Sequence, residues 1–120
     1  MKVMVVDDSK AIFMMVSQML DEQGHEAIWA EDGVVACTKL GESDVDLILL
    51  DWNMPNMSGP EFLEKNKAEG VSKAPIVMMT TENKPEYIKK ALQLGAVEYI
   101  MKPFTSDILE DKLELVFDLD

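Results

Sequence analysis

Short apolar runs alternate with amphipathic segments along this chain, and that alternation restricts the fold more than any other feature. The five runs have the length and composition of buried strands; they cover residues 3–6, 26–30, 46–50, 76–79 and 97–101. Segments with helical spacing of apolar residues follow them. Five β–α units predict an α/β fold, a parallel sheet with helices on both faces. Five strands are too few for an eight-stranded barrel, so we expect an open, doubly wound (βα)5 sheet.

Polar residues and glycines predict where the helices begin and end. The candidate N-caps are Asp8 or Ser9, Ser58 with Glu61, Asn83 with Glu86, and Thr105 or Ser106. The second helix is expected over residues 34–40, closed by Gly41, and Gly95 is expected to end the fourth. The last helix is expected to run towards Leu119.

Composition limits the classes of function. The 120 residues, 48% of them apolar, suit one domain over residues 1–120. The formal net charge is −12, and all 11 basic residues are lysines, which argues against binding nucleic acid or an anionic membrane surface. The first residues enter a strand pattern directly and no apolar run is long enough to span a bilayer, so we expect a cytoplasmic protein.

Polar residues follow four of the predicted strands, at the edge where open α/β sheets bind ligands. They are Asp7 and Asp8 after the first strand, Asp51 after the third, Thr80 and Thr81 after the fourth, and Lys102 after the fifth. Three carboxylates at one edge would repel one another unless a cation offset them, and Mg²⁺ suits such oxygen ligands. A lysine and a threonine hydroxyl suit phosphate oxygens. Taken singly, Asp8 could be only a helix cap, Thr80 only a strand end and Lys102 only a solvated charge.

Four stretches in this order resemble the response regulator receiver family over the whole chain. They are Val5–Asp8, Asp51–Met57, Met79–Thr80 and Tyr99–Phe104. The stretch Asp51–Met57 is most similar to the chemotaxis receivers of the CheY type. The resemblance implies a flavodoxin-like sheet with strand order 2-1-3-4-5.

The resemblance implies a metal-assisted phosphoacceptor site. Asp51 would accept a phosphoryl group. Asp7, Asp8 and Asp51 would bind Mg²⁺, directly or through water, together with the backbone carbonyl of Asn53. An aspartyl phosphate would then form by nucleophilic attack of a carboxylate, a step that depends on positioning and charge neutralisation.

The resemblance also implies a switch. Thr80 and Lys102 would contact the phosphoryl oxygens, and Thr80 and Tyr99 would move on phosphorylation. By its position alone, Tyr99 is better interpreted as an aromatic residue of the core. The Lys102–Pro103 peptide bond is expected to be cis, since the cis form costs little before proline.

Three positions are expected to tune the lifetime of the phosphoryl group. Asn53 and Glu82 would flank the path of the hydrolytic water and could orient it by hydrogen bonding. Thr81 stands where the family usually has a smaller residue and would slow the reaction. Taken without the resemblance, Asn53 could be a turn residue and Glu82 a solvated acid.

The resulting hypothesis is a monomeric response regulator with no output domain of its own. A sensor histidine kinase would donate the phosphoryl group. A target protein, such as the flagellar motor switch, would bind the face formed by the fourth helix, the fifth strand and the fifth helix. Three alternatives remain: a phosphorelay intermediate that passes the group to another histidine, a phosphatase with an aspartyl nucleophile, and a binding module that never uses phosphate.

Overall fold

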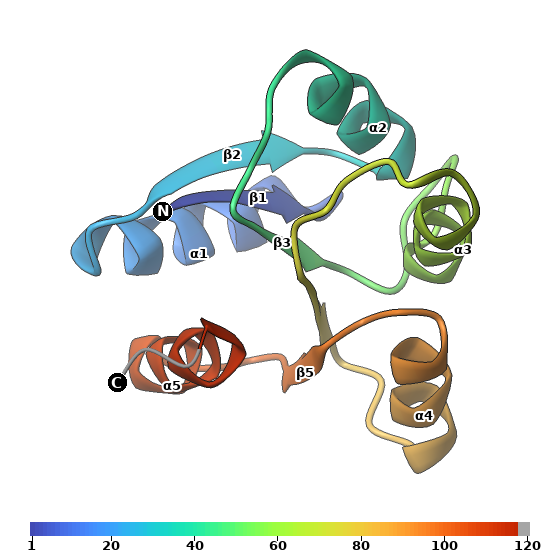
Figure 1. Cartoon of the computed structure of the whole chain (residues 1–120). Helices are drawn as coiled ribbons and strands as arrows, with labels where there is room; N and C mark the ends of the chain where they lie inside the picture. Colours follow the sequence, from blue (N-terminus) through green and yellow to red (C-terminus); the bar gives the residue numbers. More distant parts are fainter. Residues whose placement is uncertain (118–120) are drawn as a thin grey trace.

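The computed structural model describes residues 1–117, in which parallel strands alternate with helices (Figure 1). The strands are β1 (Lys2–Val6), β2 (Glu26–Ala30), β3 (Leu47–Leu50), β4 (Ile76–Thr80) and β5 (Glu98–Met101). The helices are α1 (Lys10–Glu22), α2 (Gly33–Glu42), α3 (Gly59–Glu69), α4 (Pro85–Gln93) and α5 (Ser106–Phe117). The sheet order is β2-β1-β3-β4-β5, which confirms the predicted topology. Each strand limit lies within one residue of its prediction.

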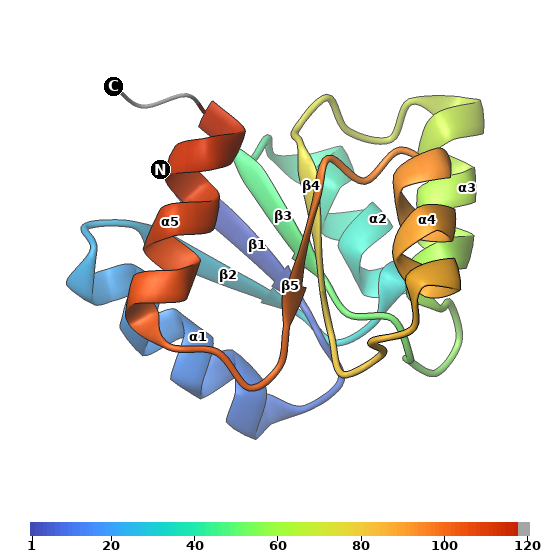
Figure 2. The same cartoon turned by 90° about the horizontal axis from the view of Figure 1, so that it is seen from below.

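Helices cover both faces of the sheet: α1 and α5 pack on one face and α2, α3 and α4 on the other (Figure 2). Central strand β3 supplies side chains to both layers, and all four of its residues are buried. Leu47 and Leu49 join the cluster beneath α1 and α5, whereas Ile48 and Leu50 join the cluster beneath α2, α3 and α4. Burial on both faces explains why the central runs are apolar without alternation. None of the helices in residues 1–117 is long and apolar enough to cross a bilayer.

Three of the predicted helix starts are confirmed. Ser9, and not Asp8, caps α1 by accepting a hydrogen bond from the Ile12 N–H at 3.2 Å. Ser58 and Glu61 form both bonds of a capping box, at 3.0 and 3.3 Å. At the start of α5, the Thr105 hydroxyl accepts from the Ile108 N–H at 3.3 Å.

Two predicted helix limits are wrong. The N-cap residue of α4 is Lys84, without a side-chain bond, so Asn83 does not cap the helix. Pro85 stands at the first helical position, where its fixed φ favours a start, and this leaves Asn83 one residue too early. Gly41 does not close α2, which continues to Glu42. Gly95 follows α4 with φ of 114° and fits its predicted role, while Leu119 lies outside the described residues.

Gly59 lets the loop after β3 fold back against the end of that strand. Its N–H donates to the Trp52 carbonyl at 2.9 Å. A Cβ at this position would lie 2.3 Å from the backbone oxygen of Asp51, closer than any real contact. The backbone oxygen of Asp51 can therefore take this position only because Gly59 has no side chain.

We expect Gly59→Ala to lower the free energy of unfolding by roughly 1–3 kcal/mol, because the backbone must shift to relieve the clash. Gly41→Ala is the matched control, since a Cβ there meets nothing within 4 Å and alanine favours a helix. It should raise that free energy by roughly 0.5–1 kcal/mol. Urea denaturation of both variants measures the difference, and equal stability of the two would contradict the packing argument.

Candidate functional site

Asp7 lies at the carboxyl end of β1, where two residues of β2 hold its backbone. Its N–H donates to the Ala30 carbonyl at 3.1 Å, and its carbonyl accepts from the Trp29 indole N–H at 2.8 Å. The Trp29 ring stacks on Phe13 of α1 at 5.4 Å between centroids. The Asp7 side chain is buried, and its Oδ1 accepts from the Ser9 N–H at 2.9 Å. Neighbouring strand and helix thus fix the direction of this carboxylate.

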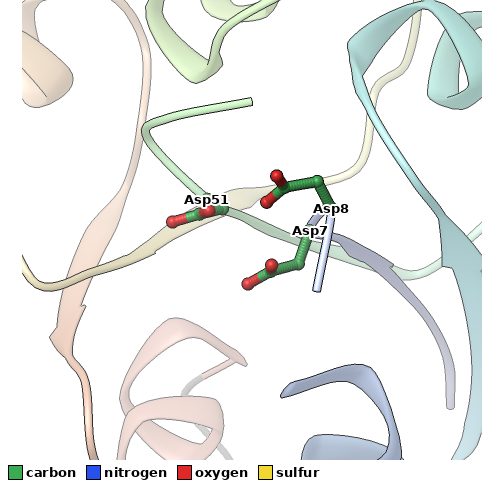
Figure 3. A group of neighbouring side chains, drawn as sticks. All are labelled: Asp7, Asp8 and Asp51. Carbon is green, nitrogen blue, oxygen red and sulfur yellow. The ribbon is translucent and has the colours of Figure 1, made fainter. Parts of the chain in front are cut away.

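Asp51 lies at the carboxyl end of the neighbouring strand β3. Its N–H donates to the Val6 carbonyl at 2.9 Å, which places it beside Asp7 and Asp8 at the end of β1. Figure 3 shows the three carboxylates gathered at this edge of the sheet. One oxygen from each can be chosen so that all three lie within 4.8 Å of one another. Asp7 and Asp51 are buried, whereas Asp8 is exposed to solvent.

Lys102, which directly follows β5, bridges the two buried acids. Its Nζ lies 2.8 Å from Asp7 Oδ2 and 3.1 Å from Asp51 Oδ1. Its backbone N–H donates to the Thr80 carbonyl at 2.9 Å, and the Lys102–Pro103 bond is cis, as predicted. Burial alone would lower the pKa of Lys102, but its two carboxylate partners outweigh burial and raise it. The lysine is therefore a fixed cation of the site.

One lysine does not neutralise the whole cluster. Burial and, secondarily, the charge of Asp7 raise the pKa of Asp51 to about 6, although Lys102 opposes the shift. A raised pKa means that the nearby positive charge does not fully offset the negative charge of ionised Asp51. Three converging carboxylates, one of them open to solvent, fit a hard divalent cation that keeps several water ligands. Asp7, Asp8 and Asp51 are the side chains that could hold Mg²⁺.

Thr80 and Tyr99 both bind the backbone of Glu82. The buried Thr80 hydroxyl accepts from the Glu82 N–H at 3.1 Å, and the Tyr99 hydroxyl donates to the Glu82 carbonyl. Burial, followed by the charge of Glu82, raises the pKa of Tyr99. The interpretation of Tyr99 as a core aromatic is confirmed, because only 7% of the residue is exposed. Its polar end nevertheless faces the loop after β4.

The three expected lifetime positions lie in the loops that follow β3 and β4. The Asn53 amide donates to Glu82 Oε1 at 3.4 Å, a contact between two different loops. Asn53 and Thr81 are exposed, and Glu82 is half-buried. The structure thus brings Asn53 and Glu82 into contact. In the sequence, Asn53 lies two residues after Asp51 and Glu82 two residues after Thr80, and this spacing did not predict a direct contact.

Sequence reasoning missed Asp32, a buried acid in the loop after β2. Its Oδ1 accepts from the Val35 N–H and its Oδ2 from the Asn56 amide, both at 2.9 Å. The residue stands at the same edge of the sheet as the other acids, and the same rule about strand ends could have identified it. It was overlooked because Glu31 separates it from β2 and Gly33 follows it, which suggests only a turn.

Comparisons with known proteins give a consistent result. A family model described as the response regulator receiver domain matches residues 3–114. The chain is 40% identical over 119 residues to chemotaxis protein CheY1 of Helicobacter pylori, covering 97% of this chain and 96% of that protein. It is 38% identical over 120 residues to chemotaxis protein CheY-3 of Vibrio cholerae, covering 98% and 92%. The solved structure of CheY4 of Vibrio cholerae matches with a TM-score of 0.88 and 39% identity, covering 96% of this chain and 97% of that one.

The raised pKa of Asp51 predicts a pH-dependent effect of Asp51→Asn on stability without metal. Since the folded-state pKa exceeds the ordinary 3.8, ionised Asp51 opposes folding. That penalty is absent below 3.8, grows as the pH rises, and is complete above about 6. At pH 7 the variant should therefore be more stable than wild type by on the order of 1–2 kcal/mol, after allowance for solvent screening.

Urea denaturation in chelator-containing buffer between pH 4 and pH 8 measures this difference. The advantage of the variant should shrink as the pH falls towards 4. The charge argument would be contradicted if the variant were less stable than wild type at pH 7. It would also be contradicted if the stability advantage of the variant did not change with pH.

Proposed function

Because the chain belongs to the response regulator receiver family, we propose that it is a signalling protein whose phosphoacceptor is Asp51. The proposed receiver domain comprises residues 1–120. The observation that carries the proposal is the position of Asp51, within reach of two further carboxylates and in direct contact with Lys102. A nucleophilic carboxylate, ligands for a cation and a fixed positive charge are the parts that phosphoryl transfer requires.

The chemistry follows from these contacts. A carboxylate oxygen of Asp51 attacks the phosphorus of a phosphohistidine, a new O–P bond forms, and the N–P bond breaks with its electron pair left on the imidazole nitrogen. Lys102 lies 3.1 Å from Asp51 and would contact an oxygen of the transferred group. The Thr80 hydroxyl would donate a hydrogen bond to another oxygen of the transferred phosphoryl group. Mg²⁺, held by Asp7, Asp8, Asp51 and the backbone carbonyl of Asn53, would offset the negative charge of nucleophile and phosphoryl group.

The contacts of Glu82 support a route from the phosphoryl group to the surface. Thr80 binds the Glu82 N–H and Tyr99 binds the Glu82 carbonyl. Movement of the Thr80 hydroxyl towards a phosphoryl oxygen would remove the partner of that N–H and so alter the loop before α4. Phosphorylation would then bias a two-state equilibrium of the loop and of Tyr99.

We propose a role in the control of motility, because relatives that are 40% and 38% identical to this chain are named chemotaxis proteins. The donor would be a sensor histidine kinase in the cytoplasm. The target, such as a component of the flagellar motor switch, would bind the face of α4, β5 and α5. Exposed apolar side chains on or beside these elements support that surface; they are Leu92, Val97, Met101 and Ile108. The protein would act as a monomer, without nucleic acid or membrane.

Incubation with acetyl phosphate and Mg²⁺ tests the phosphoacceptor. We expect wild type to gain one phosphoryl group at Asp51, detected by intact mass and peptide mapping, and Asp51→Asn to gain none. Asp44→Asn is the matched control, because this exposed acid precedes the opposite end of β3; it should label like wild type. Stable labelling of Asp51→Asn at another aspartate would exclude the assignment.

The contact between Asn53 and Glu82 predicts how fast the phosphoryl group is lost. Asn53→Arg should slow dephosphorylation, because a long cation replaces the amide that lies 3.4 Å from Glu82 and would block the path of water. Thr81→Ala should accelerate it, because a smaller exposed side chain opens access to the phosphorus. Decay of labelled protein after removal of acetyl phosphate gives the rates. Faster loss in Asn53→Arg, or slower loss in Thr81→Ala, would contradict these roles.

A further inference from the structure

Asp32 makes one more hydrogen bond than a helix cap requires. Its Oδ1 accepts from the Val35 N–H and thereby caps α2, which is the usual role of an aspartate at this position. Its Oδ2 accepts from the side-chain amide of Asn56, 2.9 Å away in the loop between β3 and α3. Asp32 is only 6% exposed and Asn56 is exposed, so this second bond is partly buried. The Asn56 amide is also the main reason that the pKa of Asp32 is lowered.

The partner of Asp32 has an unusual backbone conformation. Asn56 has φ of 65° and is the one residue other than glycine with positive φ in residues 1–117. Asparagine tolerates this region better than most residues, but the conformation still needs support from its surroundings. The adjacent Met57 packs on Gly33, where a Cβ would lie 2.7 Å from the Met57 side chain. The loop is therefore docked on the first turn of α2 by a hydrogen bond and by close packing.

The docked loop is the one that leaves the phosphoacceptor. It begins directly after Asp51 and includes Asn53, whose carbonyl is a proposed Mg²⁺ ligand. On its other side the loop is held by the Asn53–Glu82 contact, which is longer, at 3.4 Å, and exposed. The bond between Asp32 and Asn56, which is shorter and has one buried partner, is thus the stronger of these two side-chain hydrogen bonds.

We propose that Asp32 is a positioning residue for the metal site: through Asn56 it holds the β3–α3 loop in the conformation that binds Mg²⁺. This inference rests on the proposed function, because it concerns the same cation. Asp32 itself is not among the three carboxylates that converge on one point. It acts through the loop, as partners of metal ligands commonly do when they fix ligand orientation.

Three variants separate positioning from capping and from charge. Asp32→Ser keeps an N-cap oxygen but is too short to reach Asn56. Asp32→Asn also keeps the cap and can bind Asn56 again, because the Asn56 amide can turn to present its oxygen. Glu31→Gln removes one negative charge from the neighbouring exposed position and leaves both bonds of Asp32 intact.

Titration with Mg²⁺, followed by tryptophan fluorescence, gives the dissociation constant for each variant. We expect Asp32→Ser to raise it by about tenfold, near the lower end of what partners of metal ligands contribute. Asp32→Asn and Glu31→Gln should stay within about twofold of wild type, since a single screened charge has a small effect. The urea midpoint without metal should be similar for Asp32→Ser and Asp32→Asn, because both retain the cap.

Each contrary result has a distinct meaning. Wild-type affinity in Asp32→Ser, or an equal loss of affinity in all three variants, would overturn the positioning role while leaving the proposed function intact. Absence of any Mg²⁺ response in wild type would instead overturn the proposed function, and this inference with it. If Asp32→Ser fails to fold, Asn56→Gly provides the second test. Glycine accepts the positive φ but lacks the amide, so the same loss of affinity is expected, and wild-type affinity would overturn the proposal.

Discussion

Two buried carboxylates and one lysine share the carboxyl edge of the sheet, and their mutual charges govern how this end of the molecule is built. Asp7 and Asp51 directly follow the adjacent strands β1 and β3, so the parallel topology itself brings them together. Lys102 contacts both, at 2.8 and 3.1 Å, yet the pKa of Asp51 remains raised. The folded chain thus retains an excess of negative charge at a fixed point. That excess opposes folding and, by the same physics, favours a divalent cation.

Each group at this edge is held by contacts that are themselves fixed by the fold. The Trp29 indole holds the backbone of Asp7, and the missing side chain of Gly59 admits the carbonyl of Asp51. The side chains of the site are therefore oriented by the ends of the strands. Positioning of this kind is what a phosphoryl transfer reaction needs most, since the covalent chemistry belongs to the reacting groups.

Two loops at this edge, the one after β4 and the one after β3, are held by separate sets of hydrogen bonds and contact each other at one point. The loop after β4 is bound through the backbone of Glu82 by Thr80 and Tyr99, both of them buried. The loop after β3 is bound through Asn56 by Asp32. The contact between Asn53 and Glu82 links the two parts at the surface, where it is long and exposed to water. A phosphoryl group at Asp51, the proposed phosphoacceptor, would therefore affect α4 through one loop, while the other loop would keep its backbone in place.

The sequence by itself determined the fold class, the five strands and the set of acids and lysine at one edge. Strand burial and helical spacing are local patterns that can be read from the sequence. A parallel sheet brings the carboxyl ends of its strands to one edge, whatever the conformation of the loops. Helix limits were less certain, since Pro85 displaced the expected cap at Asn83. Only the tertiary structure decided the bridge made by Lys102, the contacts of Glu82 and the hydrogen bonds of Asp32. These depend on side-chain rotamers and on how distant loops close on one another, and neither is encoded by a periodic pattern.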